Sequence, residues 1–334
     1  MFRSFAIYLV ALCSWITITS SAQAPLAPLT YTNIDLPGQR QTVVGGINDS
    51  GQITGAFVDP GGIVHAYVTT SDGFQAIDFP GARATRGQGI NNRGDIVGSY
   101  VDAQRVTHGF LLQDGGFTTI DFPSPDAIFN FAADINDRGE IVGIYNTSDG
   151  ANHGFLFSRG VFTSIDLSTG PFPVTQAFGV NNRGQVVGDF DGSDFNLHGF
   201  ILDGDRVEQI DVPGEQQTGA NGLNNPGDLI GSALDANFVQ HGFLRVKVSF
   251  FTVDFPGATA TAPSKISDPG TIVGRYRDGA GALHSFLAEP SRDGQSGAQA
   301  AFASQPIPTR VCGSQEWRDH PEDIGDISTC LVQH

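Results

Sequence analysis

The chain is poor in several residue types. It holds one methionine, three cysteines, and 18 Lys and Arg against 35 Asp and Glu, which gives a formal net charge of -17. A protein that binds nucleic acid or an anionic membrane must neutralise phosphates with Lys and Arg, so this balance argues against both partners. No paired Cys and His spacing indicates zinc, and we expect no metal and no cofactor. A Gly-x-Ser-x-Gly nucleophile elbow is also missing, and we assign no catalytic residue.

Long apolar runs are missing beyond the amino terminus. A basic start, an apolar stretch over residues 5–18 and an Ala-x-Ala site at residues 22–24 predict a secretory signal peptide in residues 1–24. No later segment approaches the roughly 18 apolar residues needed to cross a bilayer. We therefore expect a secreted, monomeric protein, extracellular or periplasmic, with no membrane span.

The two cysteines that follow the predicted signal peptide are both near the carboxyl terminus. In an exported chain, Cys312 and Cys330 are expected to form a disulfide that closes the C-terminal tail, with an intermolecular bridge as the alternative. Residues 291–306 are rich in Ser, Gly, Gln and Ala, which is typical of a flexible linker. Residues 307–334 are then a small disulfide-tied appendage.

What the chain has in abundance is a repeat. The 43 glycines and 25 phenylalanines indicate a β-rich, turn-rich fold. A histidine followed by a small residue and an aromatic residue recurs every 43 to 45 residues, at His65, His108, His153, His198, His241 and His284. Such a period is typical of a repeat architecture.

Each repeat divides into four short segments. In the second copy they are a short apolar segment at residues 89–90, then residues 95–101, 108–113 and 117–122. Asn, Asp, Gly and Pro separate the segments, which alternate or run apolar as strands do. Four strands in each of six units predict an all-β fold, a six-bladed β-propeller of four-stranded blades over residues 25–290. A β-solenoid is the competing architecture, and the two tight hairpins in each unit argue against it.

The two ends of the repeat region complement each other. Residues 32–36 resemble a fourth strand with no preceding three, while the last copy ends at residues 284–288 with no fourth strand after it. We infer that residues 32–36 complete the last blade, because closing the ring removes exposed sheet edges.

These motifs resemble those of a known group. The six His-small-aromatic tripeptides, the Ile-Asn-x-x-Gly turns and the signal peptide are similar to the HAF-repeat family of predicted bacterial extracellular proteins, over about residues 31–290. Here Gly or Ser usually replaces the Ala of the family name. The resemblance implies secretion and a β-rich repeat, and it implies no reaction and no catalytic residue.

An aspartate follows each histidine at a fixed spacing of 13 residues wherever both lie in one copy. The histidine starts the third strand and the aspartate ends the fourth, so an antiparallel hairpin places them opposite each other. We interpret the pairs as structural hydrogen bonds, with a metal or acid/base role as the alternative. The pairs are His65/Asp78, His108/Asp121, His153/Asp166, His198/Asp211, His241/Asp254 and, across the ring closure, His284/Asp35.

A four-residue turn ending in glycine joins the first two strands of each copy, with the form Asn-x-x-Gly in five copies and Ser-Asp-Pro-Gly in the sixth. The second copy contains Arg93-Gly94-Asp95, a tripeptide that adhesion receptors read as a ligand. Among the six copies only the glycine of this tripeptide recurs, so we interpret the stretch as a hairpin turn. We expect the face that holds these turns to bind least.

The opposite face varies between copies, and loops on a rigid scaffold commonly carry binding. Two lengthened loops bring four aromatic residues that are candidates for ligand binding, with core packing as the alternative: Phe129, Phe131, Phe172 and Phe178. A ring of aspartates on the same face is a candidate site for a cation or a basic partner, with solvated turn residues as the alternative: Asp59, Asp102, Asp149, Asp191, Asp235 and Asp278.

Together these observations favour a secreted, non-enzymatic binding propeller whose variable face recognises a glycan, a peptide or a cationic surface. The first alternative is a carbohydrate-active hydrolase or lyase, since propellers host such chemistry, although a fold alone assigns no reaction. The second is a purely structural envelope or matrix protein.

Overall fold

The computed structural model describes residues 28–170 and 173–291. The predicted signal peptide, linker and appendage, the pair Cys312 and Cys330, and Phe172 lie outside the described residues. No helix among the described residues is long and apolar enough to cross a bilayer.

The described chain is all-β, with 24 strands that pair in six antiparallel groups of four. Group 1 comprises β2 (Gln41–Ile47), β3 (Ile53–Val58), β4 (Val64–Thr70) and β5 (Gly73–Ile77). Group 2 comprises β6 (Ala84–Ile90), β7 (Ile96–Val101), β8 (Thr107–Gln113) and β9 (Gly116–Thr119). Group 3 comprises β10 (Ala127–Ile135), β11 (Ile141–Thr147), β12 (Asn152–Ser158) and β13 (Val161–Ile165).

The second half of the chain repeats the arrangement. Group 4 comprises β14 (Thr175–Val180), β15 (Val186–Asp191), β16 (Leu197–Asp203) and β17 (Arg206–Ile210). Group 5 comprises β18 (Gln217–Leu223), β19 (Leu229–Leu234), β20 (Gln240–Val246) and β21 (Ser249–Thr252). Group 6 comprises β22 (Ala260–Ile266), β23 (Ile272–Arg277), β24 (Leu283–Pro290) and the N-terminal strand β1 (Leu29–Asn33).

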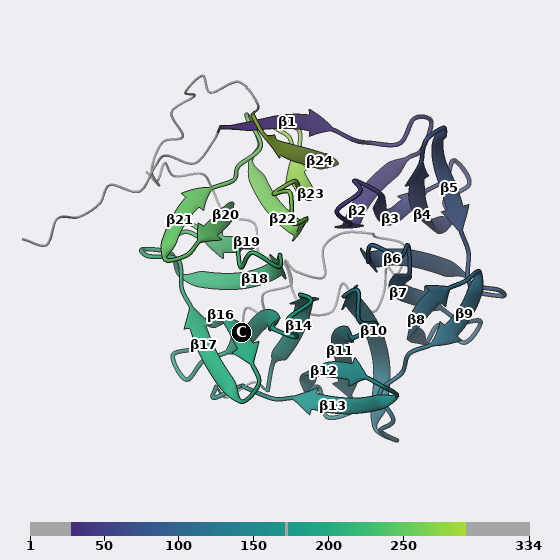
Figure 1. Ribbon diagram of the computed structural model, residues 1–334, viewed down its shortest axis with the longest axis horizontal. Helices are drawn as coiled ribbons and strands as arrows, with labels where there is room; N and C mark the ends of the chain where they lie inside the picture. The colour runs from purple at the N-terminus through teal and green to yellow at the C-terminus, as the bar shows by residue number, and fades with distance from the viewer. Residues whose placement is uncertain (1–27, 171–172, 292–334) are drawn as a thin grey trace, which may run out of the picture.

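The groups lie around a common centre, with the first strand of each group innermost (Figure 1). Single parallel backbone pairs, Val64 with Ala84 and Thr107 with Phe129, join groups 1 to 3 into one 12-stranded sheet. Strand β1 pairs antiparallel with β24, so the two ends of the described chain meet in one group. The predicted N-terminal strand at residues 32–36 therefore exists, but it begins at Leu29 and ends at Asn33.

The core lies between neighbouring groups. Val187 of β15, for example, packs in one cluster with Leu229 of β19 and Phe243 of β20, and Val142 of β11 packs with Phe200 of β16. The aromatic residue of each His-small-aromatic tripeptide is at most 1% exposed, and these residues are Tyr67, Phe110, Phe155, Phe200, Phe243 and Phe286. Since each group buries one face against the next, the repeat motif encodes the packing between groups.

A glycine in the second strand of each group allows this packing. A Cβ atom added at Gly188 would lie 1.8 Å from the carbonyl oxygen of Gln176 and 2.9 Å from the ring of Phe200. We expect Gly188→Ala to lower the free energy of unfolding by about 3 kcal/mol or more, because the backbone itself must move. In urea titrations Gly116→Ala is the control, since a Cβ there meets nothing closer than 3.6 Å. Equal stability of the two variants would contradict this account.

Candidate functional site

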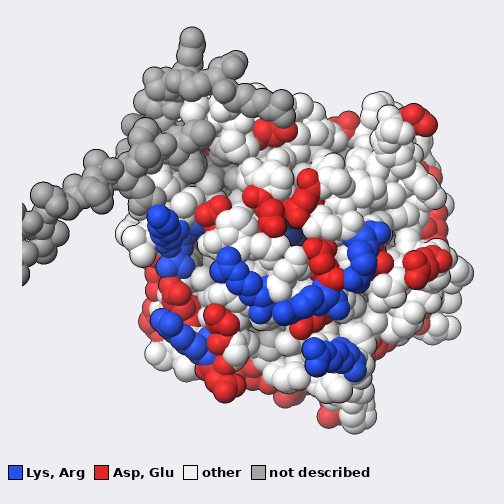
Figure 2. Space-filling model, in the orientation of Figure 1, with Lys and Arg blue, Asp and Glu red and all other residues white. Residues whose placement is uncertain are grey.

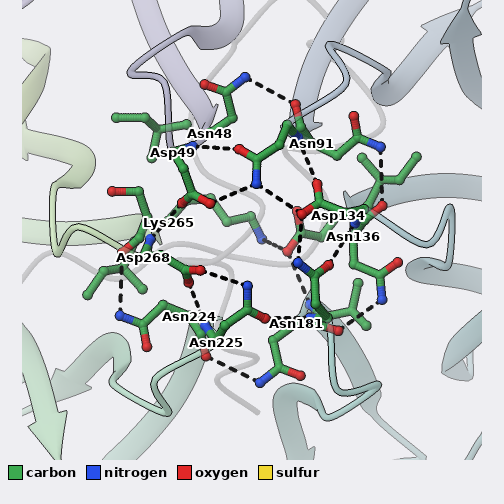
Figure 3. Close-up of a pocket in the computed structure, with 18 of the residues that line it drawn as sticks. Asn48, Asp49, Asn91, Asp134, Asn136, Asn181, Asn224, Asn225, Lys265 and Asp268 are labelled. Carbon is green, nitrogen blue, oxygen red and sulfur yellow. Dashed lines mark hydrogen bonds and ion pairs between the residues drawn. The ribbon is translucent and has the colours of Figure 1, made fainter.

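The Asn-x-x-Gly turns gather around the centre of one face, which we call the turn face. Figure 2 shows this face, with acidic side chains around a central hollow and an arc of basic side chains beside them. The hollow is a polar pocket of about 70 Å³ to which all six groups contribute, and Figure 3 shows its lining. In each turn the glycine has a positive φ and donates its N–H to the first residue of the turn, as Gly94 does to Asn91.

The first residue of five of the six turns is an asparagine that links its group to the next one, and the sixth turn has Ser267 at this place. Asn91, 3% exposed, accepts the N–H of Asp95 through Oδ1 and donates through Nδ2 to the carbonyl oxygen of Asn136 at 3.2 Å. Asparagine suits this position because its side chain carries both an acceptor and donors. The same donation to the next group recurs from Asn48, Asn136, Asn181 and Asn224.

The second residue of each turn forms a closed circle of hydrogen bonds. The N–H of each donates to the side-chain Oδ1 of the next, and the N–H of Asp268 donates to Asp49 Oδ1 at 2.7 Å, which returns the circle to its start. The members in order are Asp49, Asn92, Asp137, Asn182, Asn225 and Asp268, with donor–acceptor distances of 2.7 to 2.9 Å. The Asn and Asp side chains of the pocket therefore join the groups together (Figure 3). The sequence carried this signal, because Asn or Asp occupies this place in all six copies.

An ion pair lies at the base of the pocket. Lys265 Nζ of β22 is 3.3 Å from Asp134 Oδ2 of β10, and it also donates to the carbonyl oxygens of Phe178 and Asn221. Burial raises the pKa of Asp134 and lowers that of Lys265, and the ion pair opposes both shifts. The other four groups have glycine at the equivalent place, two residues before the turn: Gly46, Gly89, Gly179 and Gly222. The Asp134 and Lys265 side chains thus occupy space that stays open in the four groups with glycine.

The Arg-Gly-Asp stretch is folded onto itself at this face. Arg93 binds the Asp95 carboxylate through Nε and Nη2, and the same arginine donates to the carbonyl oxygen of Asp137. Asp95 is 5% exposed. The tripeptide is therefore part of the turn and offers no free carboxylate.

On the opposite face, which we call the loop face, the structure brings every histidine to its aspartate. In each pair His Nδ1 lies 2.5 to 2.8 Å from a carboxylate oxygen, and the pairs are His65–Asp78, His108–Asp121, His153–Asp166, His198–Asp211, His241–Asp254 and His284–Asp35. These hydrogen bonds raise the pKa of His241 through Asp254 and that of His284 through Asp35. Several of the imidazoles also stack on an aromatic ring of the second strand, as His153 does on Tyr145 at 4.7 Å between centroids. Because the same His–Asp contact occurs in all six groups, it is a feature of the repeated structural unit.

The aspartates of these pairs lie just beyond the fourth strands, rather than at their last position as expected from the sequence. Strand β9, for example, ends at Thr119, two residues before Asp121. An offset of one or two residues holds in all six groups, for Asp35, Asp78, Asp121, Asp166, Asp211 and Asp254. The fourth strand is the outermost of its group, so its ladder ends where the chain turns toward the next group (Figure 1). The side chain then continues the pairing, as Asp121 Oδ1 does by accepting the N–H of Gly109 at 3.1 Å.

The strength of these pairs is limited by solvent. The side chains of Asp78, Asp166 and Asp211 are 50 to 56% exposed, while that of Asp121 is 30% exposed. Exposed charge pairs contribute little to stability, because water screens them. The pairs therefore fix the position of the hairpin more than they stabilise the fold.

The predicted aspartate ring holds the loops together. Asp59, Asp102 and Asp278 contact the Nε2 atom of the histidine in their own group. Asp235 and Asp149 accept backbone N–H groups of their own turns, and Asp191 is 6% exposed. In group 4 the histidine contact comes from Asp194, whose pKa the hydrogen bond from His198 lowers to about 2. These carboxylates are engaged within the protein and do not form an open anionic ring.

The predicted aromatic patch lies in the core. Phe131 is 4% exposed and Phe178 is 8% exposed, and both pack with Ile144 while Phe129 covers the same cluster. The extra residues of the loop before group 3 extend β10 to nine residues, so Phe129 and Phe131 lie in a strand rather than in a free loop. The alternative of core packing holds for these three residues.

Two other aromatic residues are exposed on the loop face. Phe195 is 69% exposed and Phe238 is 53% exposed, in the β15–β16 turn and the β19–β20 turn of neighbouring groups. Each is the third residue before its histidine and has a positive φ, 69° and 59°. The other four copies have Gly62, Arg105, Gly150 and Gly281 at this place. A bulky residue in the left-handed region is strained, and strain of this kind concentrates at functional sites. Comparing the copies at this position would have found both residues in the sequence.

The described residues contain no group of three or more His, Cys, Asp or Glu arranged to hold a metal ion. The exposed phenylalanines give the loop face an apolar contact surface.

Comparison with known proteins identifies the type of fold. No family model and no curated protein matches the chain. Among solved structures it is similar to TolB from Acinetobacter baumannii, at 14% identity and a TM-score of 0.54, over 74% of this chain and 65% of that one. It is also similar to AofleA from Arthrobotrys oligospora, at 11% identity and a TM-score of 0.50, over 80% and 88% of the two chains. A six-bladed β-propeller lectin of Aleuria aurantia with a fucose recognition mode matches at 11% identity and a TM-score of 0.42, over 77% and 93%. At these identities the likeness concerns the fold alone, an all-β fold of the propeller type.

Proposed function

We propose that the chain is a secreted, six-bladed β-propeller that binds an extracellular ligand on its loop face and catalyses no reaction. The six groups and the closed circle of hydrogen bonds on the turn face support the blade count and the closure of the ring. The HAF-repeat resemblance and the predicted signal peptide support export.

The observation that carries the binding proposal is the exposure of Phe195 and Phe238 in strained turns of adjacent groups. Glycine meets the backbone requirement of this turn without strain in three copies, so the fold itself does not require an aromatic residue there. Exposed aromatic side chains on rigid turns provide apolar contact surface at a small entropic cost. We therefore place the ligand between the β15–β16 and β19–β20 turns.

An array of glycans and peptides, probed with the purified protein, tests this proposal. We expect the double variant Phe195→Gly with Phe238→Gly to lose about 10-fold or more of the signal of any ligand that the parent binds. Arg105→Gly is the matched control, because it makes the same backbone change in group 2 and removes no aromatic residue. A parent that binds nothing, or a double variant that binds as the parent does, would refute the proposed site.

The same variants carry an expectation for stability. Phe195→Gly and Phe238→Gly should each raise the free energy of unfolding by about 0.5 to 1 kcal/mol, since relief of left-handed strain exceeds the entropy that glycine adds to the unfolded chain. Arg105, with φ of 67°, should show the same gain when replaced by Gly. Thermal melts and urea titrations measure the effect. A loss of stability in all three variants would show that the turns are unstrained.

A further inference from the structure

A small polar cavity lies between groups 4 and 5, the two groups that carry the exposed phenylalanines. Its volume is about 20 Å³, which is enough for one water-sized group. Strands β15, β16, β18, β19 and β20 line it, and the lining includes Leu197 and Gln240, each two residues after an exposed phenylalanine. The cavity therefore belongs to the same part of the loop face as the proposed ligand site.

Two residues that line this cavity each have a buried acceptor atom without a hydrogen-bond partner. The two atoms are Oδ1 of Asp189 and Oε1 of Gln217. Asp189 is 7% exposed, and burial raises the pKa of its carboxyl group to about 7. Among the described residues, no other ionisable side chain lines the cavity. Buried acceptors without donors are rare in folded proteins, because each loses its water without compensation.

The repeat shows that the fold does not require this carboxylate. The equivalent residues of the other second strands are Ala56, Ser99, Ile144, Ser232 and Arg275. Facing Asp189 across the cavity is Gly219, where an added Cβ atom would lie 3.1 Å from Asp189 Oδ2. Among these six equivalent positions, only the one in group 4 has a carboxylate, and that carboxylate faces the open space beside Gly219.

The two acceptors determine which chemical group would fit. An occupant of water size must supply at least two donor hydrogens, and a positive charge on it would balance the carboxylate. A hydroxyl group has one donor hydrogen, and a planar guanidinium with its five N–H groups exceeds the volume. A primary ammonium group has three donors on one compact atom.

We infer that this cavity binds the primary ammonium group of the ligand, held by Asp189 and Gln217, with Phe195 and Phe238 contacting the rest of the molecule. The inference rests on the proposed function, since it names the ligand chemistry for the same site. The net charge of -17 attracts such cations to the protein. A ring face also attracts an ammonium ion, so the two phenylalanines suit a cationic ligand.

Calorimetric titration of the purified protein at pH 8 tests the inference with two matched probes. Nα-acetyl-lysine methylamide carries an –NH3⁺ group, and its Nε-trimethyl derivative carries the same charge without an N–H donor. We expect the first to bind at least about 10-fold more tightly than the second. Glucosamine against N-acetylglucosamine repeats the comparison for a sugar, and the arm with the tighter binding identifies a peptide or an amino sugar as the source of the ammonium group.

Two variants test the residues. Asp189→Asn removes the charge and Gly219→Ala fills the space while keeping the charge, and each should weaken ammonium binding by about 10-fold or more. For the parent, affinity should rise between pH 6 and pH 8, because the bound form requires an ionised Asp189. Circular dichroism confirms that each variant folds.

The outcomes separate the inference from the proposed function. Equal binding of the trimethyl probe, no binding of any amine, or no effect of Asp189→Asn would overturn the inference and leave the cavity to a single water molecule. If ligands from the array still bind in a manner that depends on Phe195 and Phe238, the proposed function stands without it. If the double phenylalanine variant also binds as the parent does, both are refuted.

Discussion

Replacement of Lys265 by Met is expected to lower the free energy of unfolding by about 3 to 5 kcal/mol. The variant removes the ammonium group 3.3 Å from Asp134 Oδ2 and leaves a carboxylate whose side chain is 14% exposed. Backbone N–H donors to that carboxylate remain, from Val180 and Ile135, and they cannot balance a full buried charge. Urea titration at pH 8 measures the change. At this pH an unfolded chain has an ionised Asp134, so the folded variant must either bury that charge without its partner or take up a proton.

A second variant separates charge from packing. Asp134→Asn combined with Lys265→Met removes both charges and keeps the shape of the Asp134 side chain, so most of the lost stability should return. If the double variant is as unstable as Lys265→Met alone, the loss comes from packing of the lysine stem. Single-variant losses below about 1 kcal/mol would mean that the pair contributes little, as exposed ion pairs do.

Much of the fold could be predicted because the repeat expresses the same constraints six times. The fixed spacing of 13 residues between histidine and aspartate encodes a hairpin, and the structure brings His284 to Asp35 across 249 residues. A fixed spacing predicts a contact here because, in an antiparallel hairpin, the number of residues between two positions determines whether they lie opposite each other. The short error at the N-terminal strand, which begins at Leu29, was avoidable: with Asp35 aligned to Asp78, Thr30 corresponds to Gly73, the first residue of the fourth strand of group 1.

The candidate site was harder to predict, because aromatic residues in a loop sequence do not show whether their side chains point into the core or into solvent. Phe131 and Phe178 occur beside lengthened loops, yet strand β10 carries Phe131 into the core next to Ile144. In group 3 the extra residues lengthened a strand, where side chains alternate between faces. Whether such a side chain is buried depends on how its strand packs against the neighbouring group. The sequence of one loop does not contain that information.

The informative positions are those at which one copy departs from the others. Asp134 and Lys265 replace glycine, Phe195 and Phe238 replace glycine in a strained turn, and Asp189 is the one carboxylate where the other copies have Ala, Ser, Ile or Arg. Positions that recur in all copies explain how the six groups pack together, because each group needs them. The departures are not needed in every group, so a ligand site that occurs once in the molecule would lie among them.

The Asp189 carboxyl group should make stability depend on pH in a way that its removal reveals. Its pKa is about 7 in the folded protein and near 3.9 in an unfolded chain, so between these values the folded state binds the extra proton. The contribution of Asp189 to the free energy of unfolding is therefore fully present below about pH 4. It falls as pH rises to 7, by roughly 2 to 4 kcal/mol in total. Asp189→Asn lacks this loss, and its advantage over the parent should be near zero at pH 4 and largest at pH 8.

The difference between the two titration curves isolates Asp189, because the histidines titrate alike in both proteins. Contributions from His241 and His284, whose pKa values are raised, also fade as pH rises, and they cancel in the difference. Asp72→Asn, which removes one carboxylate from an exposed turn, is the control. A constant difference for Asp189→Asn would mean that its carboxyl group is not strained by burial. Added lysine derivative should remove the loss in the parent at pH 8 if the ammonium group binds Asp189, since a ligand that binds only the folded state stabilises it.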